Sequence, residues 1–580
     1  MTTPAHLDFR SVNSLWGSVA AETLVRCGVR RAVISPGSRS TPLTLALVAH
    51  GGIETIPVLD ERSAAFFALG LAKQSGEPVV LLCTSGTAGA NYLPAIIEAR
   101  ESAVPLIVIT ADRPQEMRAC ASGQTIDQLK LFGDFVNFFH ELAVPEASEA
   151  RLRYLRQTLA HAADRALQPV AGPVHLNAPF RDPLTPADDG GVTATAVAAV
   201  DWPLFFSHLL PPFSTSVAGP LPHFSNDVHG IIVAGAGQPA DPAGHAAVVG
   251  EIATRLGWPV LADGLSPLRN HASTVPHLVS TYDTILRNEA AAERLKPEAV
   301  LCLGGWPTSK VLRAWIEASG ARIWLVTRRL DNRDALHGRT VHLPVSLGAL
   351  AAEVPYATEP NGYEQMWAGY EHRMRVALDS RLSQYDDLFE GRVAALLAQH
   401  LPVESTLCIA NSMPVRDVEY FWPPGDRMIR PLGNRGANGI DGTLSTALGV
   451  AHSSGAPTTL LTGDLALLHD TNGWLILPKF KGALTVVLIN NAGGGIFEHL
   501  PIAEVEPPFE EFFATPQVVD FAKLCAAYGA DHIAVSDWAQ FETLIEHPPS
   551  SGVRVLEVRT DRKKDAATRK AMFAELAAEL

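Results

Sequence analysis

Short apolar runs alternate with longer, partly polar stretches through the first third of the chain. Runs rich in Val, Ile and Leu, with the length of strands, lie at 31–34, 53–59, 78–83 and 104–110. Two stretches between them, 61–73 and 88–100, have the length and pattern of helices. Apolar strands that alternate with helices predict a parallel, doubly wound sheet, whose ligands bind beyond the carboxyl ends of the strands.

The same alternation returns twice further along the chain. A second series has predicted strands at 230–235, 299–303 and 322–326, and a third has strands at 458–462 and 484–489 on either side of a predicted helix at 470–479. The segment 182–227 is rich in Pro, Ala, Gly, Thr and Ser and is typical of a linker. We therefore predict an α/β protein of three doubly wound parallel-sheet domains, at 1–185, 186–350 (which includes the linker) and 351–580.

Composition narrows the class of protein. The 580 residues are 47% hydrophobic and 18% charged, which is typical of a globular enzyme. A net charge of −15 argues against nucleic-acid binding, and no apolar stretch is long enough to predict a membrane span. The six cysteines lie far apart without a CxxC pair, and no apolar segment of a secretory signal is present at the N-terminus. We expect reduced thiols and a cytoplasmic location.

One local pattern predicts a site for a divalent cation and a diphosphate. Gly463-Asp464 ends a predicted strand, and the next strand delivers Asn491, 27 residues after Asp464, followed by a glycine-rich turn at 492–495. A carboxylate, an amide oxygen and a backbone carbonyl at one sheet edge are oxygen ligands that suit Mg²⁺. The helix N-terminus after Asp464 favours phosphate. From the spacing alone, two ordinary turns explain the pattern equally well.

The pattern resembles the diphosphate motif of thiamine-diphosphate enzymes, in which a glutamate of the first domain contacts the aminopyrimidine ring. Glu61, in Leu59-Asp60-Glu61-Arg62, stands where that glutamate belongs. Taken alone, Glu61 is an acid that favours the first turn of a helix. Active sites of this superfamily form between domains of two subunits, so the resemblance implies a homodimer or homotetramer with active sites at the interface.

Five further motifs resemble one family more closely, the 2-succinyl-5-enolpyruvyl-6-hydroxy-3-cyclohexene-1-carboxylate synthases, or MenD enzymes. They are Ser35-Pro36-Gly37-Ser38-Arg39-Ser40-Thr41-Pro42-Leu43, Thr110-Ala111-Asp112-Arg113-Pro114, Asn411-Ser412-Met413-Pro414-Val415-Arg416, Asn434-Arg435-Gly436-Ala437-Asn438-Gly439-Ile440-Asp441-Gly442 and Gly463-Asp464-Leu465. The resemblance runs from about residue 10 to the C-terminus and is weakest in the middle third. It implies a transferase of menaquinone biosynthesis that decarboxylates 2-oxoglutarate on thiamine diphosphate and adds the succinyl carbanion to isochorismate in a 1,4-addition.

The resemblance also implies the site residues. The catalytic residue is Glu61, and it would bind the cofactor together with Thr84, Gly86, Ile440, Gly463, Asp464, Leu465, Asn491, Gly494, Ile496 and Phe497. The ligands of Mg²⁺ (or Mn²⁺) would be Asp464, Asn491 and Gly493. Both substrates are dicarboxylates, which match the planar fork of arginine. The residues expected to bind them are Ser38, Arg39, Arg113, Gln124, Lys310, Ser412, Arg416 and Arg435.

Some features depart from the family pattern or favour another interpretation. Val311 follows Lys310 where some relatives have a second basic residue, and Ala492 replaces an asparagine. Gly235-Ala236-Gly237 lacks the third glycine of a dinucleotide fingerprint, so we interpret it as a turn. Two alternatives remain. One is another thiamine-diphosphate lyase, such as a decarboxylase or acetolactate synthase relative that acts on a monocarboxylate, and the other is a non-catalytic regulator that binds thiamine diphosphate or a nucleotide. The arginines disfavour the first alternative, and Glu61 disfavours the second.

Overall fold

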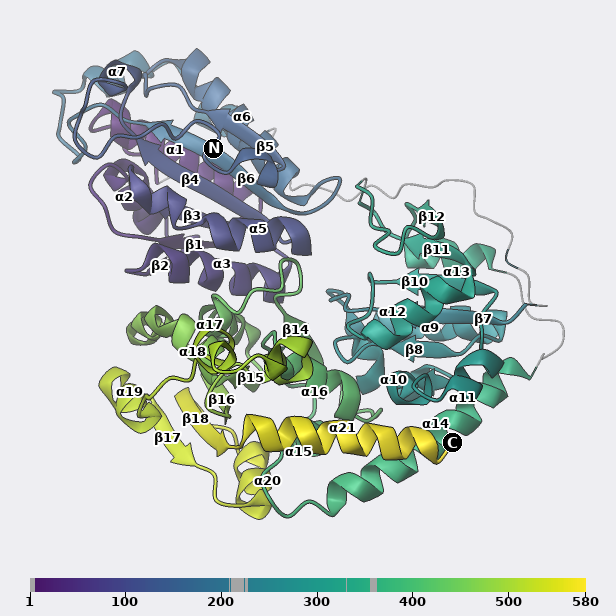
Figure 1. The fold of residues 1–580 in the computed structure, drawn as a ribbon. Coiled ribbons are helices and arrows are strands. Elements are labelled where there is room, and N and C mark those ends of the chain that lie inside the picture. Colours follow the sequence, from purple (N-terminus) through teal and green to yellow (C-terminus); the bar gives the residue numbers. More distant parts are fainter. Residues whose placement is uncertain (1–5, 208, 210–223, 225–227, 330, 355–361) are drawn as a thin grey trace. The chain divides into compact units, whose positions relative to one another are not determined.

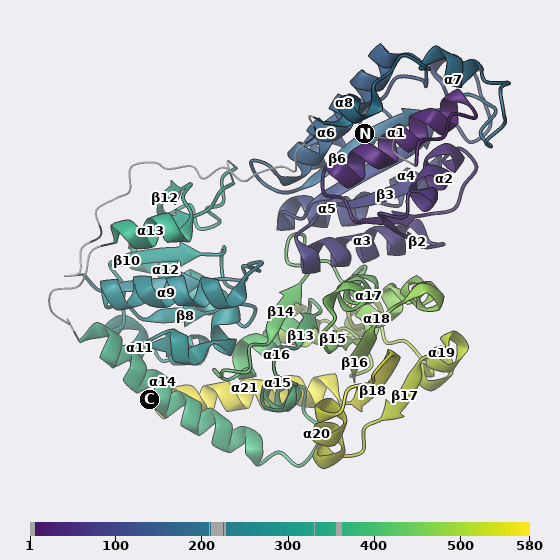
Figure 2. The same cartoon turned by 180° about the vertical axis from the view of Figure 1, so that it is seen from behind.

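The computed structural model describes residues 6–207, 209, 224, 228–329, 331–354 and 362–580, which form three sheets flanked by helices (Figures 1 and 2). Each sheet has six strands, and the strand pairs described are all parallel. This arrangement confirms the predicted fold class. One sheet falls in each of the ranges 1–185, 186–350 and 351–580, which we propose as the domains.

The first sheet, sheet A, has the strand order β2-β1-β3-β4-β6-β5. Its strands are β1 (Arg31–Ile34), β2 (Glu54–Pro57), β3 (Val79–Cys83), β4 (Leu106–Asp112), β5 (Phe138–Glu141) and β6 (Pro173–Pro179). The α-helices of this part of the chain are α1 (Val12–Arg26), α2 (Thr41–Ala49), α3 (Glu61–Ser75), α4 (Thr87–Ala90), α5 (Leu93–Ser102), α6 (Glu149–Leu167), α7 (Val192–Ala196) and α8 (Trp202–Phe206). The strand order reverses between β1 and β3, so the loops after these two strands form the position where open α/β sheets bind ligands.

The second sheet, sheet B, has the order β12-β11-β10-β7-β8-β9. Its strands are β7 (Gly230–Ala234), β8 (Val260–Ala262), β9 (Leu278–Val279), β10 (Ala299–Leu303), β11 (Arg322–Val326) and β12 (Arg339–Leu343). The α-helices are α9 (Pro242–Leu256), α10 (Tyr282–Ile285), α11 (Glu289–Arg294), α12 (Lys310–Ser319) and α13 (Leu347–Glu353). The loop after β7 packs on the loop after β10, because a Cβ on Gly235 would lie 2.0 Å from the carbonyl oxygen of Gly305. The Gly235–Gly237 segment is thus a turn packed against backbone.

The third sheet, sheet C, has the order β14-β13-β15-β16-β18-β17. Its strands are β13 (Thr406–Ile409), β14 (Arg430–Gly433), β15 (Thr458–Gly463), β16 (Ala483–Asn490), β17 (Asp531–Ala534) and β18 (Gly552–Arg559). The α-helices from here to the C-terminus are α14 (Tyr363–Ser383), α15 (Glu390–His400), α16 (Met413–Phe421), α17 (Thr443–Ser454), α18 (Asp464–His469), α19 (Phe521–Tyr528), α20 (Trp538–Glu546) and α21 (Arg562–Ala578). Counted along the chain within each sheet, the strands of sheets A and C have the same order.

The chain divides into two compact units. Unit 1 comprises Met1–Thr215, Asn434–Ser454 and Asp470–Lys481, and unit 2 comprises Ser216–Gly433, Gly455–His469 and Gly482–Leu580. Unit 1 therefore contains sheet A together with α17, and unit 2 contains sheets B and C. One apolar core extends from sheet B to sheet C within unit 2, and sheet A has a core of its own.

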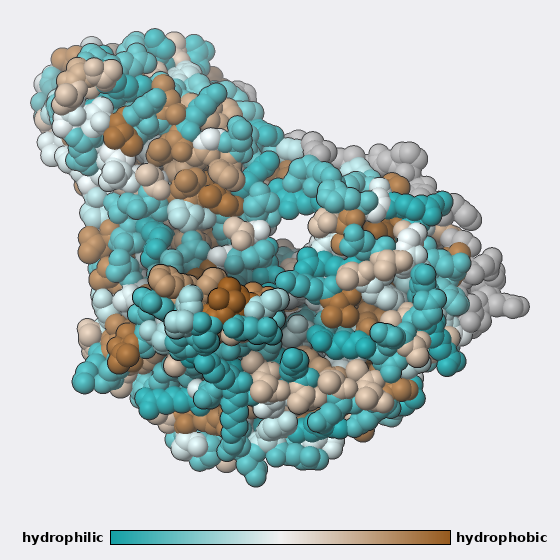
Figure 3. Space-filling model, in the orientation of Figure 1, coloured by the Kyte–Doolittle hydropathy of each residue, from teal (hydrophilic) through white to brown (hydrophobic). Residues whose placement is uncertain are grey.

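The central strands are buried on both faces, which explains their apolar runs. Every residue of β3 and β4 is buried. Strands covered by helices on both sides read as continuous Val, Ile and Leu segments rather than as alternating ones. Figure 3 shows apolar residues in small groups among hydrophilic ones on the face displayed. Among the described residues, no helix has the length and apolar character needed to cross a bilayer.

Two predicted helices differ in detail from the structure. The stretch 88–100 is broken, because α4 ends at Ala90 and α5 begins at Leu93 with Pro94 in its first turn. Proline has no N–H, so Pro94 cannot donate to the carbonyl oxygen of Ala90, and the helical hydrogen-bond pattern is interrupted there. The stretch 470–479 forms the 3-10 helix η5 (Thr471–Lys479).

Candidate functional site

The loops after β1 and β3 contact each other in unit 1. A Cβ on Gly37 would lie 2.2 Å from the Cβ of Thr84, so only glycine permits this approach. The backbone N–H of Arg39 donates to Thr84 Oγ1 at 3.2 Å. Ser38 lies between Gly37 and Arg39 with its side chain exposed. Three predicted site residues, Ser38, Arg39 and Thr84, are thereby brought to the same edge of sheet A.

Two arginines at this edge have guanidinium atoms without partners. Arg39 is 7% exposed and donates from Nη1 to the carbonyl oxygen of Phe180 at 2.9 Å. Arg113 donates from Nη1 to Ser85 Oγ and to the carbonyl oxygen of Gln124, the latter at 2.8 Å. The Nε atoms of both arginines are buried and have no hydrogen-bond partner among the described residues. Burial, and then the charge of Arg39, lower the pKa of Arg113, so this edge favours an anion.

Hydrogen bonds of the exposed Gln124 and of the buried Gln128 and Asn177 connect the remaining loops of this edge. Gln124 donates from Nε2 to the carbonyl oxygen of Ser85 at 2.9 Å, and Gly86 N donates to Gln128 Oε1 at 2.9 Å. Gln128 in turn donates to Asn177 Oδ1 at 2.9 Å. The predicted residues Gln124 and Gly86 are therefore joined, through Gln128, to β6. Gln128 and Asn177 were missed by the sequence analysis because no motif surrounds them.

Glu61 is the first residue of α3 and is half-buried. Asp60 caps the helix, because its carboxylate accepts from Ser63 N at 2.8 Å. Burial raises the pKa of Tyr92, and the negative charge of Glu61 adds to that rise. Tyr92 donates from its hydroxyl to Ser35 Oγ at 3.2 Å, just beyond β1. Glu61 therefore lies near the carboxyl ends of β1 and β3, with the two arginine-bearing loops.

The loop that carries Arg435 and Ile440 also belongs to unit 1. Glu98, on α5, is 3% exposed, and its carboxylate accepts from Gly436 N at 3.1 Å and from Ala437 N at 2.7 Å. A hollow of about 220 Å³ beside this loop is lined by Phe66, Leu93, Pro94, Ile97, Glu98, Asn434, Ala437, Gly439 and Asp441. The sequence analysis missed Glu98, which lies 338 residues before Gly436.

Helix α17, which follows this loop, packs on α3 at a crossing of two glycines. A Cβ on Gly70 would lie 2.1 Å from the carbonyl oxygen of Thr446, and one on Gly449 would lie 2.2 Å from the carbonyl oxygen of Phe67. The helix backbones thus touch without intervening side chains. The close packing fixes the loop that precedes α17 relative to the helix that begins with Glu61.

In unit 2, the loops after β15 and β16 also meet. Asp464 is 4% exposed, and its Oδ1 accepts from Leu465 N while its Oδ2 accepts from Gly493 N, both at 2.8 Å. Burial raises the pKa of Asp464 to about 6. A cation at this carboxylate would lower that pKa again and stabilise the ionised form. Gly463, Asp464 and the segment Asn491–Gly493 are brought together as neighbours on one edge.

The residues at this edge fit a divalent cation. Asn491 is 6% exposed, and its Oδ1 is buried and has no hydrogen-bond partner among the described residues. A buried acceptor without a partner costs about 1–3 kcal/mol, and a cation would remove that penalty. The carbonyl of Gly493 accepts from Gly495 N at 2.9 Å and has a second lone pair for a metal. With the Asp464 carboxylate, these oxygens form the donor set that Mg²⁺ or Mn²⁺ prefers.

The glycine-rich turn after β16 is held in place by contacts with Ala514 and Arg562. Gly493 has φ +135°, and a Cβ there would lie 2.4 Å from the carbonyl oxygen of Ala514. Gly494 N donates to the same carbonyl oxygen at 2.7 Å, and Arg562 Nη1 donates to the carbonyl oxygen of Ala492 at 3.0 Å. Because the contact of Ala492 is made by its backbone, the replacement of asparagine at this position leaves the turn intact.

The apolar residues predicted to line the cofactor lie beside this turn. Leu465, Ile496 and Phe497 are all half-buried. The ring of Phe497 packs edge to face on that of Phe513, with centroids 5.8 Å apart. Gly494 is buried, and a Cβ there would lie 2.8 Å from Phe497 Cδ2.

Ser412, Arg416 and Lys310 complete the predicted residues of unit 2. Ser412 follows β13 with φ +72°, and its carbonyl oxygen accepts from Arg416 Nη1 at 2.6 Å. Burial lowers the pKa of Arg416, and the charge of Arg313 contributes to that shift. Lys310 is exposed at the start of α12, and Arg313 lies one turn further along the same helix.

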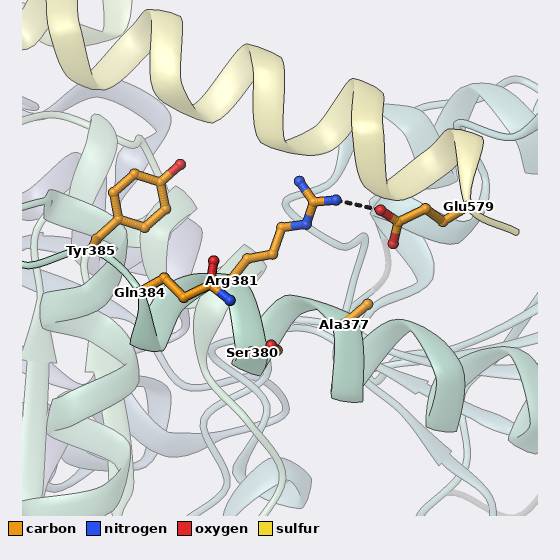
Figure 4. Close-up of a pocket in the computed structure, with 6 residues that line it drawn as sticks. All are labelled: Ala377, Ser380, Arg381, Gln384, Tyr385 and Glu579. Atoms are coloured by element: carbon orange, nitrogen blue, oxygen red, sulfur yellow. Dashed lines mark hydrogen bonds and ion pairs between the residues drawn. The ribbon is translucent and has the colours of Figure 1, made fainter.

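A cavity of about 510 Å³ in unit 2 lies apart from the predicted residues. It is lined by Ala377, Ser380, Arg381, Gln384, Tyr385 and Glu579. Figure 4 shows Arg381 extending from α14 toward Glu579, with which it forms an ion pair, and Arg381 also pairs with Glu575. Because its cation is already neutralised by two carboxylates, the cavity does not resemble a second anion site.

The predicted residues fall into two sets, according to the unit that contains them. The group in unit 1 comprises Ser38, Arg39, Glu61, Thr84, Gly86, Arg113, Gln124, Arg435 and Ile440. The group in unit 2 comprises Lys310, Ser412, Arg416, Gly463, Asp464, Leu465, Asn491, Gly493, Gly494, Ile496 and Phe497. The first group is rich in donors for an anion, and the second contains the acceptors for a cation.

Comparisons with known proteins match three domain models in succession along the chain. Residues 16–131 match the model "Thiamine pyrophosphate enzyme, N-terminal TPP binding domain", 221–409 match "Middle domain of thiamine pyrophosphate", and 423–558 match "Thiamine pyrophosphate enzyme, C-terminal TPP binding domain". The chain is 52% identical over 557 residues to the 2-succinyl-5-enolpyruvyl-6-hydroxy-3-cyclohexene-1-carboxylate synthase of Microcystis aeruginosa, covering 96% of this chain and 98% of that protein. It is 50% identical over 568 residues to the synthase of the same name from Gloeothece citriformis, covering 97% of each chain. The chain therefore belongs to the 2-succinyl-5-enolpyruvyl-6-hydroxy-3-cyclohexene-1-carboxylate synthase family of thiamine-diphosphate enzymes.

Proposed function

We propose that this protein is a thiamine-diphosphate-dependent transferase that acts on 2-oxoglutarate and isochorismate. It removes CO₂ from 2-oxoglutarate and adds the remaining succinyl group to isochorismate in a 1,4-addition. The product is 2-succinyl-5-enolpyruvyl-6-hydroxy-3-cyclohexene-1-carboxylate, an intermediate of menaquinone biosynthesis. Membership of the family supports the reaction. The observation that carries the choice of substrates is that Arg39 (buried) and Arg113 (half-buried) both have a buried Nε atom without a hydrogen-bond partner among the described residues.

The cofactor would be held by the acceptors of unit 2 and by Glu61. Asp464, Asn491 and Gly493 would bind Mg²⁺ or Mn²⁺, which neutralises the diphosphate. Glu61 would hydrogen-bond the nitrogen of the aminopyrimidine ring and hold or release the proton there. When bound, thiamine diphosphate supplies the carbon nucleophile and the electron sink for decarboxylation. Ile440 would support the cofactor as an apolar contact.

The substrates would be held by cations and neutral donors. Arg39 and Arg113 would bind carboxylates through their guanidinium groups, which offer charge-assisted hydrogen bonds. Gln124 and Ser38 would add neutral contacts at the same edge. In unit 2, Arg416 would bind a further carboxylate. Ser412, Lys310 and Arg435 complete the proposed set. We also propose that the chain works as a homodimer or homotetramer, as in the superfamily that it resembles.

Release of CO₂ from labelled 2-oxoglutarate tests the proposal. The protein is assayed with thiamine diphosphate and Mg²⁺, with and without isochorismate. We expect rapid release and a succinyl-cyclohexene product only when isochorismate is present. Equal release without isochorismate would instead indicate a simple decarboxylase, and no release in either case would indicate a binding protein.

The variant Glu61→Gln separates catalysis from cofactor binding. It preserves the shape of the side chain but removes the acid. We expect kcat to fall by about 10²- to 10⁴-fold, the usual contribution of a positioned acid or base. A variant with unchanged kcat would contradict the role of Glu61.

A further inference from the structure

The amide of Asn491 is held from behind by a buried carboxylate. Asn491 Nδ2 donates to Glu390 Oε1 at 2.7 Å, and Glu390 is the first residue of α15, 3% exposed. An ionised carboxylate only accepts hydrogen bonds. The amide nitrogen must therefore face Glu390, because the opposite rotamer would place two acceptor oxygens against each other.

This constraint decides where the amide oxygen lies. Oδ1 and Nδ2 lie on opposite sides of the Cβ–Cγ bond, so with Nδ2 fixed on Glu390, Oδ1 points away from Glu390. That oxygen is buried and has no hydrogen-bond partner among the described residues. The neighbouring loop contributes Asp464, whose Oδ2 accepts from Gly493 N at 2.8 Å. The orientation of the amide therefore leaves Asn491 Oδ1 as an acceptor at the edge of sheet C, where Asp464 supplies a carboxylate.

Glu390 is itself held by two further hydrogen-bond donors. Arg569 Nη2 donates to Glu390 Oε2 at 3.3 Å, and Thr560 Oγ1 donates to Glu390 Oε1 at 3.3 Å. Arg569 is 3% exposed and also donates to Asp417 Oδ1 at 2.6 Å. The side chain of Glu390 thus has its lone pairs aimed at Arg569, Thr560 and Asn491.

We propose that Glu390 is a positioning residue for the divalent cation: it fixes the amide of Asn491 so that Oδ1, and not Nδ2, faces the metal. The inference rests on the proposed function, because the cation is the one proposed to bind Asp464 and Asn491. Glu390 does not touch the cation itself. Its effect passes through a single hydrogen bond, as is usual for groups that orient metal ligands from outside the coordination sphere.

The first test is the affinity for Mn²⁺ in the variant Glu390→Gln, measured by electron paramagnetic resonance with saturating thiamine diphosphate. The new amide can present either its oxygen or its nitrogen to Asn491, so the orientation of Asn491 is no longer fixed. We expect Mn²⁺ to bind about 10- to 100-fold more weakly, the usual effect of losing such a partner. The matched control is Glu419→Gln, which replaces another buried glutamate of unit 2 (1% exposed) that is bonded to Gly264 and Tyr282. It should bind Mn²⁺ as the unmodified protein does.

A second variant distinguishes positioning from general structural damage. In Glu390→Gln/Asn491→Asp, the new amide donates to the new carboxylate, whose other oxygen then faces the cation. We expect the double variant to bind Mn²⁺ more tightly than Glu390→Gln alone. Thermal unfolding in EDTA, without cofactor, checks that each variant is folded.

The outcomes separate this inference from the proposed function. If folded Glu390→Gln binds Mn²⁺ as tightly as the unmodified protein, or if the double variant shows no recovery, the inference is wrong and the cation site still stands. If the unmodified protein fails to bind Mn²⁺ in the presence of thiamine diphosphate, the proposed function fails first and the inference with it.

Discussion

Sheets A and C have the same strand order but offer opposite chemistry at the same position. In each sheet, the order reverses between the first and third strands, and ligands are expected beyond the carboxyl ends there. At the edge of sheet A, the unpartnered buried atoms are donors, the Nε groups of Arg39 and Arg113. After β16 of sheet C, by contrast, Asn491 Oδ1 is a buried acceptor without a partner among the described residues. Under the proposed function, the same strand order would thus support an anion site in sheet A and a cation site in sheet C.

The fourth strand of each sheet shows how structural and ligand-binding polar groups differ. Asp112 ends β4 and is fully buried, but Arg113 N, Asn177 Nδ2 and Arg118 Nη2 all donate to its carboxylate, at 2.7, 2.9 and 3.0 Å. Asn491 comes just after β16 and is also buried, yet its oxygen has no donor among the described residues. A buried carboxylate is thus not by itself a metal ligand, because what matters is which lone pairs the protein leaves unsatisfied.

The largest effect should come from removing the carboxylate of sheet C. Asp464→Asn keeps the size of the side chain but removes its charge, so the proposed cation loses its only anionic protein ligand. We expect kcat to fall by about 10²- to 10³-fold, the range for removal of one group that stabilises charge in an active site. Mn²⁺ binding, measured by electron paramagnetic resonance, should weaken in parallel. Unchanged Mn²⁺ affinity would show that the acceptors of sheet C do not form the cation site.

Removing a hydrogen-bond donor from the edge of sheet A should weaken the binding of a substrate without changing the affinity for the cation. Arg113→Met preserves the apolar stem and removes the guanidinium group. A hydrogen bond to a charged group contributes about 1.5–3 kcal/mol, so kcat/KM for 2-oxoglutarate or isochorismate should fall by about 10- to 150-fold while the Mn²⁺ affinity is unchanged. The control is Arg118→Lys, because Arg118 is already paired with Asp112 and Glu141. If both variants lower kcat/KM equally, the unpartnered Nε of Arg113 is not what binds the substrate.

The difference between the two edges could be predicted only in part from the sequence. The apolar runs of β3 and β4 and the loops that end them are local features, since buried parallel strands have a recognisable composition. The motifs around Arg39, Arg113 and Asp464 were likewise contiguous. The partners that fix these groups were not, because Glu390 lies 101 residues from Asn491. A single hydrogen bond between distant segments leaves no periodicity or spacing in the sequence.

Asp112, whose carboxylate already accepts three hydrogen bonds, should affect the stability of the fold rather than the binding of the cation. Asp112→Asn removes the charge that pairs with Arg118 and turns one acceptor oxygen into a donor that faces other donors. We expect the free energy of unfolding to fall by about 1–3 kcal/mol, the cost of leaving buried polar groups unpaired. Denaturant unfolding measures that loss, and Mn²⁺ binding should not change. If Asp112→Asn instead lowers the Mn²⁺ affinity strongly and hardly changes the free energy of unfolding, Asp112 takes part in cation binding and its role is not purely structural.

The stability of the two units should also depend on pH with opposite sign. In unit 1, burial lowers the pKa of His175 to about 3. Between pH 3 and the usual histidine pKa of 6.5, His175 binds a proton in the unfolded chain but stays neutral in the folded chain. The contribution of neutral His175 to the free energy of unfolding is therefore complete above pH 6.5 and is lost as the pH falls toward 3. In unit 2, burial raises the pKa of Glu419 to about 8, against the usual 4.5. The folded chain holds the carboxyl proton of Glu419 more tightly than the unfolded chain does. The contribution of protonated Glu419 to the free energy of unfolding is therefore complete below pH 4.5 and is lost as the pH rises toward 8.

Two variants isolate these contributions. His175→Gln should remove part of the loss of stability on acidification, and Glu419→Gln part of the loss between pH 5 and 8, each by at most about 1.4 kcal/mol per pH unit. The groups around Glu419 include Asp263, whose charge adds to the raised pKa, and Arg269, whose charge opposes it. Denaturant unfolding at pH 5, 6, 7 and 8 gives the slopes. If the slope of Glu419→Gln stays parallel to that of the unmodified protein, Glu419 is already ionised in the folded state, and Arg269 rather than burial determines its charge.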